Sequence, residues 1–222
     1  MIKTIKVTGI GELDIAPDTT EIHVSLTDVK KKYSEALADS ASAVEALQEA
    51  FMKCGFAKED LKTIRFNINE ENDSYEDEKG RWRTRFAGYR YNTDCRLSFP
   101  ASNETLGKCL SALAESPAKP RFSIRYTVGD PKKMTKALMK LAVKDAKAKA
   151  KVLAENAGVT LGNVVHISYT DSYNSIALSP VEEMCADGMY KAKIAGAPAI
   201  QMNVTPDNIH AKEYVTILFA IE

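Results

Sequence analysis

The feature that most constrains the fold is a unit that occurs twice along the chain. Each copy has a helical pattern, a glycine, a short connection, an alternating segment and the tripeptide Asp-Ser-Tyr. Gly55 precedes the alternating segment 61–68, and Gly158 precedes the segment 164–169. Glycine commonly ends a helix because it adopts the left-handed conformation without strain. We therefore predict two pseudo-repeats, at about residues 18–99 and 120–222, joined by a short helix at 102–115 within one domain spanning 1–222.

Hydrophobic periodicity predicts the elements of each copy. Polar and apolar residues alternate as in half-buried strands at residues 20–26, 61–68, 82–99, 121–128, 164–169 and 214–221. Apolar residues recur every three or four positions, as in helices, at 30–54, 102–115 and 130–157. Asp130 should cap the last helix, with Pro131 at its first position. The acidic, turn-rich residues 70–80 are predicted to form a loop.

These elements predict an α+β fold built from a duplicated β-α-β-β unit. We expect a mixed or mainly antiparallel sheet with the long helices on one face, both copies sharing a single curved layer. Residues 19–128 have the β-α-β-β-α-β order of a ferredoxin-like split unit. Gly9 and Gly11 lack the third glycine and the following helix of a phosphate loop, so a bulge or tight bend is expected there.

Composition excludes some classes of protein. Lysine plus arginine and aspartate plus glutamate both number 30, and the zero net charge argues against a dedicated nucleic-acid binder. The sequence has no apolar run long enough for a transmembrane segment. The start of the chain lacks the pattern of a signal peptide, which predicts a cytoplasmic location as it stands. A periplasmic or cell-envelope location is expected if a leader has been removed.

Motifs that carry chemistry are absent from the sequence. It contains no zinc motif, Walker sequence, paired-carboxylate signature or Ser/His/Asp order, so we assign no catalytic residue, cofactor-binding residue or metal ligand. Surface or packed positions are expected for the histidines, which are His23, His166 and His210. The cysteines are interpreted as free, partly buried thiols, with redox sensing by one of them as the alternative. They are Cys54, Cys95, Cys109 and Cys185.

Charged residues gather in two places. Lysines at steps of three and four form one stripe of the 130–157 helix, namely Lys136, Lys140, Lys144, Lys147 and Lys151. The opposite, core-facing side is predicted to carry Leu138, Ala142, Ala146, Leu153 and Ala157. The lysine stripe is interpreted as a solvated face, with binding to an anionic partner as the alternative.

The second charged region lies at a hairpin with a long tip, which we expect to form by pairing of residues 61–68 with 85–99. Arginines alternate with aromatic residues after Arg81, directly following the acidic residues 70–78. Such a pattern can bind nucleic acid, but charge pairing across the hairpin explains both runs. A projecting hairpin can also contact another subunit, so Trp82, Arg83 and Arg85 are candidate interaction residues.

The segment 177–206 is long for a loop, and its apolar side chains suggest docking against a neighbouring subunit. Met184, Met189 and Ile194 are the candidate interaction residues there.

Several motifs together resemble the SIMPL-domain family. They are Val7-Thr8-Gly9-Ile10-Gly11-Glu12 with Pro17-Asp18, the alanine-rich stretch 146–154 with Gly158, Leu161-Gly162-Asn163-Val164, and Thr205–Ile209 with the alternating segment 214–221. Where the family usually has Pro-Gly, this chain has Pro206-Asp207. The resemblance implies export in bacteria, a link to oxidative-stress tolerance and, in one member, a ring-like homo-oligomer. It carries over no catalytic residue.

The leading interpretation is therefore a non-enzymatic, self-associating protein that acts through homo-oligomeric assembly or partner binding, in stress or envelope physiology. The alternative is an enzyme or small-ligand-binding protein with a site between the sheet and the 177–206 segment. No cofactor is expected, and the sequence identifies no small-molecule ligand.

Overall fold

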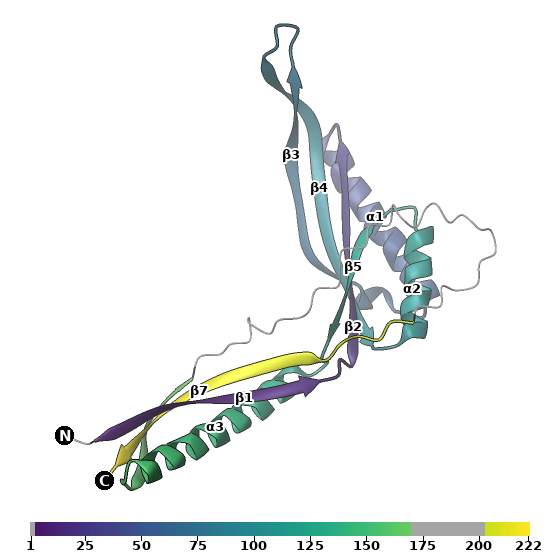
Figure 1. The fold of residues 1–222 in the computed structure, drawn as a ribbon. Helices are drawn as coiled ribbons and strands as arrows, with labels where there is room; N and C mark the ends of the chain where they lie inside the picture. Colours follow the sequence, from purple (N-terminus) through teal and green to yellow (C-terminus); the bar gives the residue numbers. More distant parts are fainter. Residues whose placement is uncertain (1–2, 170–202) are drawn as a thin grey trace. The chain divides into compact units, whose positions relative to one another are not determined.

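A computed structural model describes residues 3–169 and 203–222 of the chain (Figure 1). These residues form an α+β structure with strands in two antiparallel sheets, which confirms the predicted fold class. They divide into two compact units. Unit 1 contains residues 3–18, 127–169 and 206–222, and unit 2 contains residues 19–126 with 203–205.

Unit 2 contains the elements of the predicted ferredoxin-like unit. They are β2 (Thr19–Lys30), α1 (Tyr33–Lys53), the short 3₁₀ helix η1 (Lys58–Asp60), β3 (Lys62–Glu76), β4 (Trp82–Pro100), α2 (Asn103–Glu115) and β5 (Arg121–Thr127). The sheet order is β3-β4-β2-β5, and β4 is antiparallel to both β2 and β3. Because β4 lies between them, β2 and β3 form a split β-α-β unit with α1, as the sequence predicts.

The core of unit 2 follows from the alternation of its strands. Every second residue is buried from Thr20 to Leu26 in β2 and from Tyr91 to Phe99 in β4, and the apolar ones pack with side chains of α1, α2 and β5. Members of this core include Ile22, Val24, Leu26, Leu47, Phe51, Cys95, Leu97, Leu110, Phe122 and Ile124. Ser102 begins α2 by accepting a hydrogen bond from the Thr105 amide at 3.2 Å.

Unit 1 is a three-stranded sheet with one long helix. It comprises β1 (Thr4–Ile15), α3 (Pro131–Asn156), β6 (Leu161–Tyr169) and β7 (Ile209–Ile221), with the order β1-β7-β6. Figure 1 shows α3 running along β1 and β7. Pro131 is the first residue of α3, and Asp130 accepts a hydrogen bond from the Lys133 amide at 2.9 Å. Both features confirm the predicted start of this helix.

The buried face of α3 is a row of every fourth residue. Its members are Met134, Leu138, Ala142, Ala146, Ala150 and Ala154. The prediction is confirmed for three of these and wrong for Leu153 and Ala157, which are exposed. Steps of four advance slowly around a helix of 3.6 residues per turn, so the row winds as the sheet beneath it twists. The five predicted stripe lysines are exposed.

The strands form two sheets, so the prediction of one shared layer is wrong. The order β6-β7-β1 corresponds to β3-β4-β2, with β1 in the position that a strict repeat would give to β5. Side-chain size explains the difference. β5 buries Phe122 and Ile124 in the core of unit 2, whereas β1 has Gly9 and Gly11 where its backbone approaches α3.

Gly9 and Gly11 allow the backbone of β1 to lie directly against α3. A Cβ atom at Gly9 would lie 2.0 Å from the Ala142 carbonyl oxygen, and one at Gly11 would lie 2.0 Å from the Leu138 carbonyl oxygen. The pairing of β1 with β7 runs from Thr4 to Ile15 without a register shift. The predicted bulge or bend is therefore wrong, and the two glycines instead allow the helix to approach the strand closely.

The predicted loop at 70–80 is largely strand. β3 continues to Glu76 and β4 begins at Trp82, so Asp73, Ser74 and Tyr75 belong to a strand. The second Asp-Ser-Tyr, at 171–173, lies outside the described residues. Acidic residues in β3 are offset by basic partners in β4, which explains why a turn-like composition forms a ladder.

Among the helices of the described residues, none is both long and apolar enough to span a membrane.

Candidate functional site

The most distinctive surface of unit 2 is a two-stranded extension, here called the projecting hairpin, formed by residues 71–87. The pairing of β2 with β4 ends at Lys30 and Tyr89, whereas the pairing of β3 with β4 continues to Glu76 and Trp82. Figure 1 shows both strands extending past the end of β2 and the start of α1. Isolated two-stranded hairpins are marginally stable in water, so this one needs additional contacts.

Ion pairs across the hairpin supply part of that stabilisation and confirm the predicted charge pairing. Arg90 binds the Glu71 carboxylate through two hydrogen bonds of 2.8 and 2.7 Å. Arg83 lies 3.1 Å from Asp77, and Arg85 lies 3.8 Å from Asp73. The Arg90 guanidinium lowers the pKa of the Glu71 carboxyl. The arginines therefore have local partners, which favours a structural role over contact with nucleic acid.

The turn of the hairpin is organised by one carboxylate. Asp77 accepts hydrogen bonds at 3.0 Å from the backbone amides of Lys79 and Arg81. These amides, with the Arg83 side chain, lower the pKa of the Asp77 carboxyl. Gly80 completes the turn with a φ angle of 71°, a conformation that favours glycine.

A β-bulge next to Gly88 determines which side chains share a face. The register shifts between the pairs Glu71–Gly88 and Asn72–Phe86, so Ala87 is the extra residue. Without the bulge, Phe86 and Tyr89 would lie on opposite faces of β4. With it, their ring centroids are 5.3 Å apart, and Tyr89 packs against Tyr33 of α1 at 5.7 Å.

The result is an aromatic row, formed by Trp82, Phe86, Tyr89 and Tyr33. Trp82 lies on the Phe86 face because four residues separate them along the strand. Trp82 is 75% exposed and Phe86 is 48% exposed. The core-facing side of β4 thus continues beyond α1 as an apolar surface that no other described residues cover. Surfaces of this kind commonly mark interaction sites.

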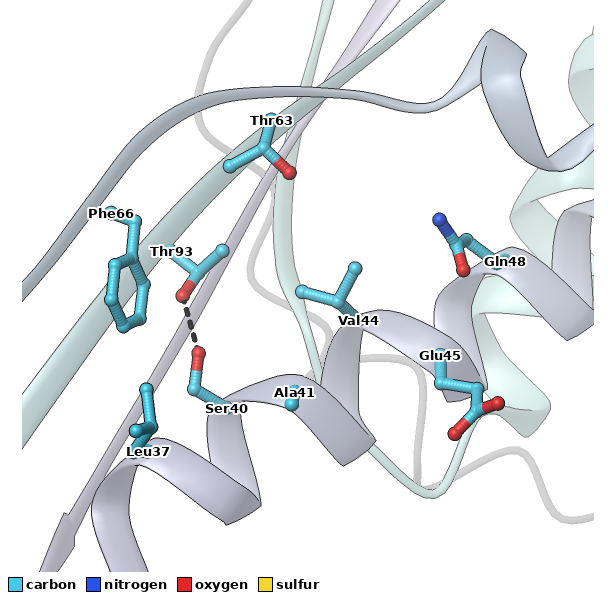
Figure 2. Close-up of a pocket in the computed structure, with 9 residues that line it drawn as sticks. All are labelled: Leu37, Ser40, Ala41, Val44, Glu45, Gln48, Thr63, Phe66 and Thr93. Carbon is cyan, nitrogen blue, oxygen red and sulfur yellow. Dashed lines mark hydrogen bonds between the residues drawn. The ribbon is translucent and has the colours of Figure 1, made fainter. Parts of the chain in front are cut away.

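A groove adjoins the aromatic row where α1 leaves β3 uncovered. It has a volume of about 410 Å³ and contains Leu37, Val44 and Phe66, with Ser40, Thr63 and Thr93 as polar groups. Figure 2 shows the hydrogen bond between the Ser40 and Thr93 hydroxyls, which lies at 2.8 Å and is buried. Such a groove can hold an apolar side chain beside a few hydroxyls.

The Ser40–Thr93 bond predicts the effect of a substitution at the groove. Ser40→Ala removes one hydroxyl and leaves that of Thr93 buried without this partner. We expect a loss of about 1–2 kcal/mol in the free energy of unfolding. Urea denaturation measures this loss. Thr63→Val is the control because, among the described residues, the Thr63 hydroxyl has one hydrogen-bond partner, the Cys95 sulfur at 3.8 Å. Equal, negligible losses for both variants would contradict a structural role for the bond.

The structure does not bring all the candidate residues from the sequence together at one site. Trp82, Arg83 and Arg85 all lie on the projecting hairpin, with Trp82 on the aromatic face and both arginines on the opposite one. Met184, Met189 and Ile194 lie outside the described residues, as does Cys185. His23 contacts Glu21, and His210 contacts Asp14. Within residues 3–169 and 203–222, no three potential metal-ligating side chains form a cluster.

Three features were missed in the sequence. Leu37 and Phe66 occur at ordinary core positions, so nothing marks them as half-exposed lining of a groove. The β-bulge did have a sequence signal, because Gly88 interrupts the alternating pattern of the strand and an isolated glycine in a strand suggests a bulge. Cys54 packs against the apolar core that contains Cys109, and no sequence signal indicates this because 55 positions separate the two residues.

Comparison with known proteins adds the family. The chain is 26% identical over 218 residues to the 26 kDa periplasmic immunogenic protein of Brucella melitensis, covering 98% of this chain and 84% of that protein. It is 25% identical over 218 residues to the protein of the same name in Brucella abortus, with the same coverage. Residues 5–219 match the SIMPL family, described as a protein of unknown function (DUF541). The match extends across both units and nearly the whole sequence, so this protein belongs to the SIMPL family.

Proposed function

We propose that this protein is a non-enzymatic, self-associating protein whose copies contact one another through the projecting hairpin. The observation that carries this proposal is the uncovered extension of β3 and β4 with its exposed aromatic row. In the isolated hairpin the aromatic side chains are exposed to water and the strand edges are unpaired. A second copy would bury those side chains and pair those edges, and both changes favour association.

Charge favours a second copy as the occupant. Residues 69–78 contain six acidic and no basic side chains, and residues 79–90 contain five basic and no acidic ones. Each chain therefore has an acidic strand edge and a basic one. Glu70, Glu76 and Glu78 form no ion pair within the described part of the chain, so they remain available to a neighbour.

The same charges select one mode of pairing. Joining β3 to β3, or β4 to β4, brings like charges together, whereas joining β3 of one copy to β4 of the next brings opposite charges together. Contact of one surface with a different surface of the next copy is heterologous, and it generates closed rings or filaments. Trp82, Arg83 and Arg85 then have the interaction role that the sequence suggests.

The compartment that we propose is the periplasm or cell envelope. The names of the Brucella relatives place those proteins in the periplasm. This supports the second of the two locations considered from the sequence. A role in oxidative-stress physiology remains a prediction from the family resemblance.

The alternative function is binding or conversion of a small ligand. The α1–β3 groove offers an apolar pocket with hydroxyl groups, which favours binding over catalysis. Most of the 177–206 segment, proposed as the other wall of a site, lies outside the described residues.

Substitution of the aromatic row tests the assembly. We expect the unmodified protein to be an oligomer at tens of micromolar, and Trp82→Ser with Phe86→Ser to give a monomer of unchanged circular dichroism. Truncating central aromatic contacts typically costs about 2 kcal/mol or more each, enough to dissociate a moderate complex. Light scattering coupled to size exclusion measures the mass.

Raising the salt concentration from about 0.1 M to about 1 M should also weaken the oligomer, because the strand edges attract through charge.

The matched control is Tyr214→Ser, which removes an aromatic ring of similar exposure from β7 in unit 1. It should leave the oligomer intact. A monomeric unmodified protein, or an oligomer that survives the double substitution, would refute the proposal. Trp82 is the only tryptophan, so its emission in the unmodified protein should shift to shorter wavelength as concentration rises.

A further inference from the structure

Two cysteines of unit 2 meet where the C-terminal end of α1 packs against α2. Cys54 is the residue that ends α1, and Cys109 lies on the buried face of α2. Cys109 belongs to the apolar core of unit 2, Cys54 packs against that core, and each thiol affects the pKa of the other. The Cys54 thiol donates a hydrogen bond to the Ala50 carbonyl oxygen at 3.6 Å. Both are thiols in this structure.

The two thiols differ in access to solvent. Cys54 is partly exposed and lines a surface groove of about 320 Å³ with Lys53, Lys108 and Ser111. Cys109 is fully buried. Burial raises the pKa of the Cys109 thiol to about 12. Burial also raises the pKa of Cys54, but the neighbouring Cys109 thiol and the Lys108 charge partly offset that effect. Cys54 is therefore the thiol that an external reagent reaches first.

We propose that Cys54 and Cys109 form an oxidisable pair that closes to an intramolecular disulfide between α1 and α2 on reaction with a disulfide-bearing oxidant. The Cys54 thiolate attacks the external disulfide, forms a mixed disulfide and expels one thiolate. The sulfur of Cys109 then attacks the Cys54 sulfur and expels the second thiolate. Two protein thiols are oxidised, the external disulfide is reduced to two thiols, and the two protons pass to these thiols.

The disulfide would have a structural consequence. It would link the end of α1 to the middle of α2, and so tie together the two helices that share the core of unit 2. Cross-linking restricts the unfolded chain, and a loop of this length predicts a clear stabilisation. The proposal does not depend on self-association, since both cysteines lie in one chain and away from the projecting hairpin.

The test uses the full-length protein and oxidised glutathione. After alkylation of the remaining thiols, trypsin cleaves after Lys53 and Lys108, so each cysteine begins its own peptide. We expect a linked pair of these peptides, loss of two of the four thiols, and a rise in melting temperature of about 5 °C or more. The dithiol form should return on treatment with dithiothreitol.

Variants make the outcome decisive. Cys54→Ser and Cys109→Ala should each abolish the linked peptides, and Cys109→Ala should accumulate glutathione on Cys54. Cys95→Ala is the matched control, because Cys95 is equally buried and has Thr63 as its partner. It should leave the linkage unchanged. A lasting glutathione adduct on Cys54 in the unmodified protein, a link from Cys54 to Cys185, or four unreacted thiols would each overturn the proposal.

Discussion

Replacing Gly9 with alanine should destabilise unit 1 by about 4 kcal/mol, a large effect for one methyl group. The added carbon would lie 2.0 Å from the Ala142 carbonyl oxygen and 2.5 Å from the Ala146 amide nitrogen. Both are backbone atoms of α3, so no side-chain rotation relieves the overlap. The helix and strand must separate, which opens the apolar cluster that includes Val7, Ala142 and Ala146.

Hydrogen exchange at the amides of β1 and α3, with urea denaturation followed by circular dichroism, measures this effect. Gly162→Ala is the control, since its new carbon lies 3.1 Å from the Ala220 carbonyl oxygen, a contact that a small shift relieves. We expect the control to cost less than about 1 kcal/mol. Equal stability of the two variants would show that the close approach of α3 to β1 is not required.

The same approach protects the free edge of β1. The Ile10 amide donates a hydrogen bond to Asp145 of α3 at 2.8 Å, and Lys149 forms a 2.6 Å ion pair with that carboxylate. Unpaired strand edges tend to associate with other strands, and a charged side chain bound to the edge prevents this. Among the described residues, the projecting hairpin has such a contact only at its base, where Lys31 donates a hydrogen bond to the Ala87 carbonyl oxygen at 2.8 Å. This contrast between the two units supports the hairpin as the contact between copies.

Structural features were predictable from the sequence where they depend on residues that are close together in the chain. The start of α3 was predictable because Asp130 and Pro131 act on neighbouring amides. The ion pairs of the hairpin were predictable in kind, since the two charged runs adjoin each other in sequence. These features depend on residues close together in the chain, where spacing alone decides the geometry.

The partner of α3 was not predictable. Gly9 and Gly11 fit against the alanines of α3, but more than a hundred residues separate the two halves of this contact. Each half has a simpler local interpretation, as a bend for the glycines and as a generic helix face for the alanines. The predicted pseudo-repeat at 120–222 groups residues 121–128 with α3, whereas Phe122 and Ile124 of β5 pack in the core of unit 2.

At the candidate site the sequence contained a local signal, but hydrophobic periodicity alone did not show which side chains would share a face. Gly88 interrupts the alternation of β4, and the structure places a bulge there. One extra residue reverses the faces of all the residues that follow it. The aromatic row therefore exists only because of the bulge, since Trp82 and Phe86 would otherwise face away from Tyr89 and Tyr33.

Replacing Gly88 with alanine should therefore affect both the fold of the hairpin and its function. Gly88 has a φ angle of 154°, and an added Cβ would lie 2.4 Å from the Lys30 carbonyl oxygen and 2.9 Å from Val29 Cγ1. We expect a local loss of about 3 kcal/mol, from backbone strain together with steric overlap. Hydrogen exchange at the amides of 83–92 should increase, and the oligomer should dissociate as it does after substitution of the aromatic row.

Gly80→Ala separates these effects from a general weakening of the hairpin. Gly80 also has a positive φ angle, of 71°, but its added carbon would meet only the Glu76 carboxylate, at 3.4 Å. This control should cost about 1 kcal/mol at the turn and leave the aromatic row in place. We expect it to retain the oligomer. Dissociation by both variants would mean that the stability of the hairpin controls assembly, whereas dissociation by Gly88→Ala alone would assign that control to the face selected by the bulge.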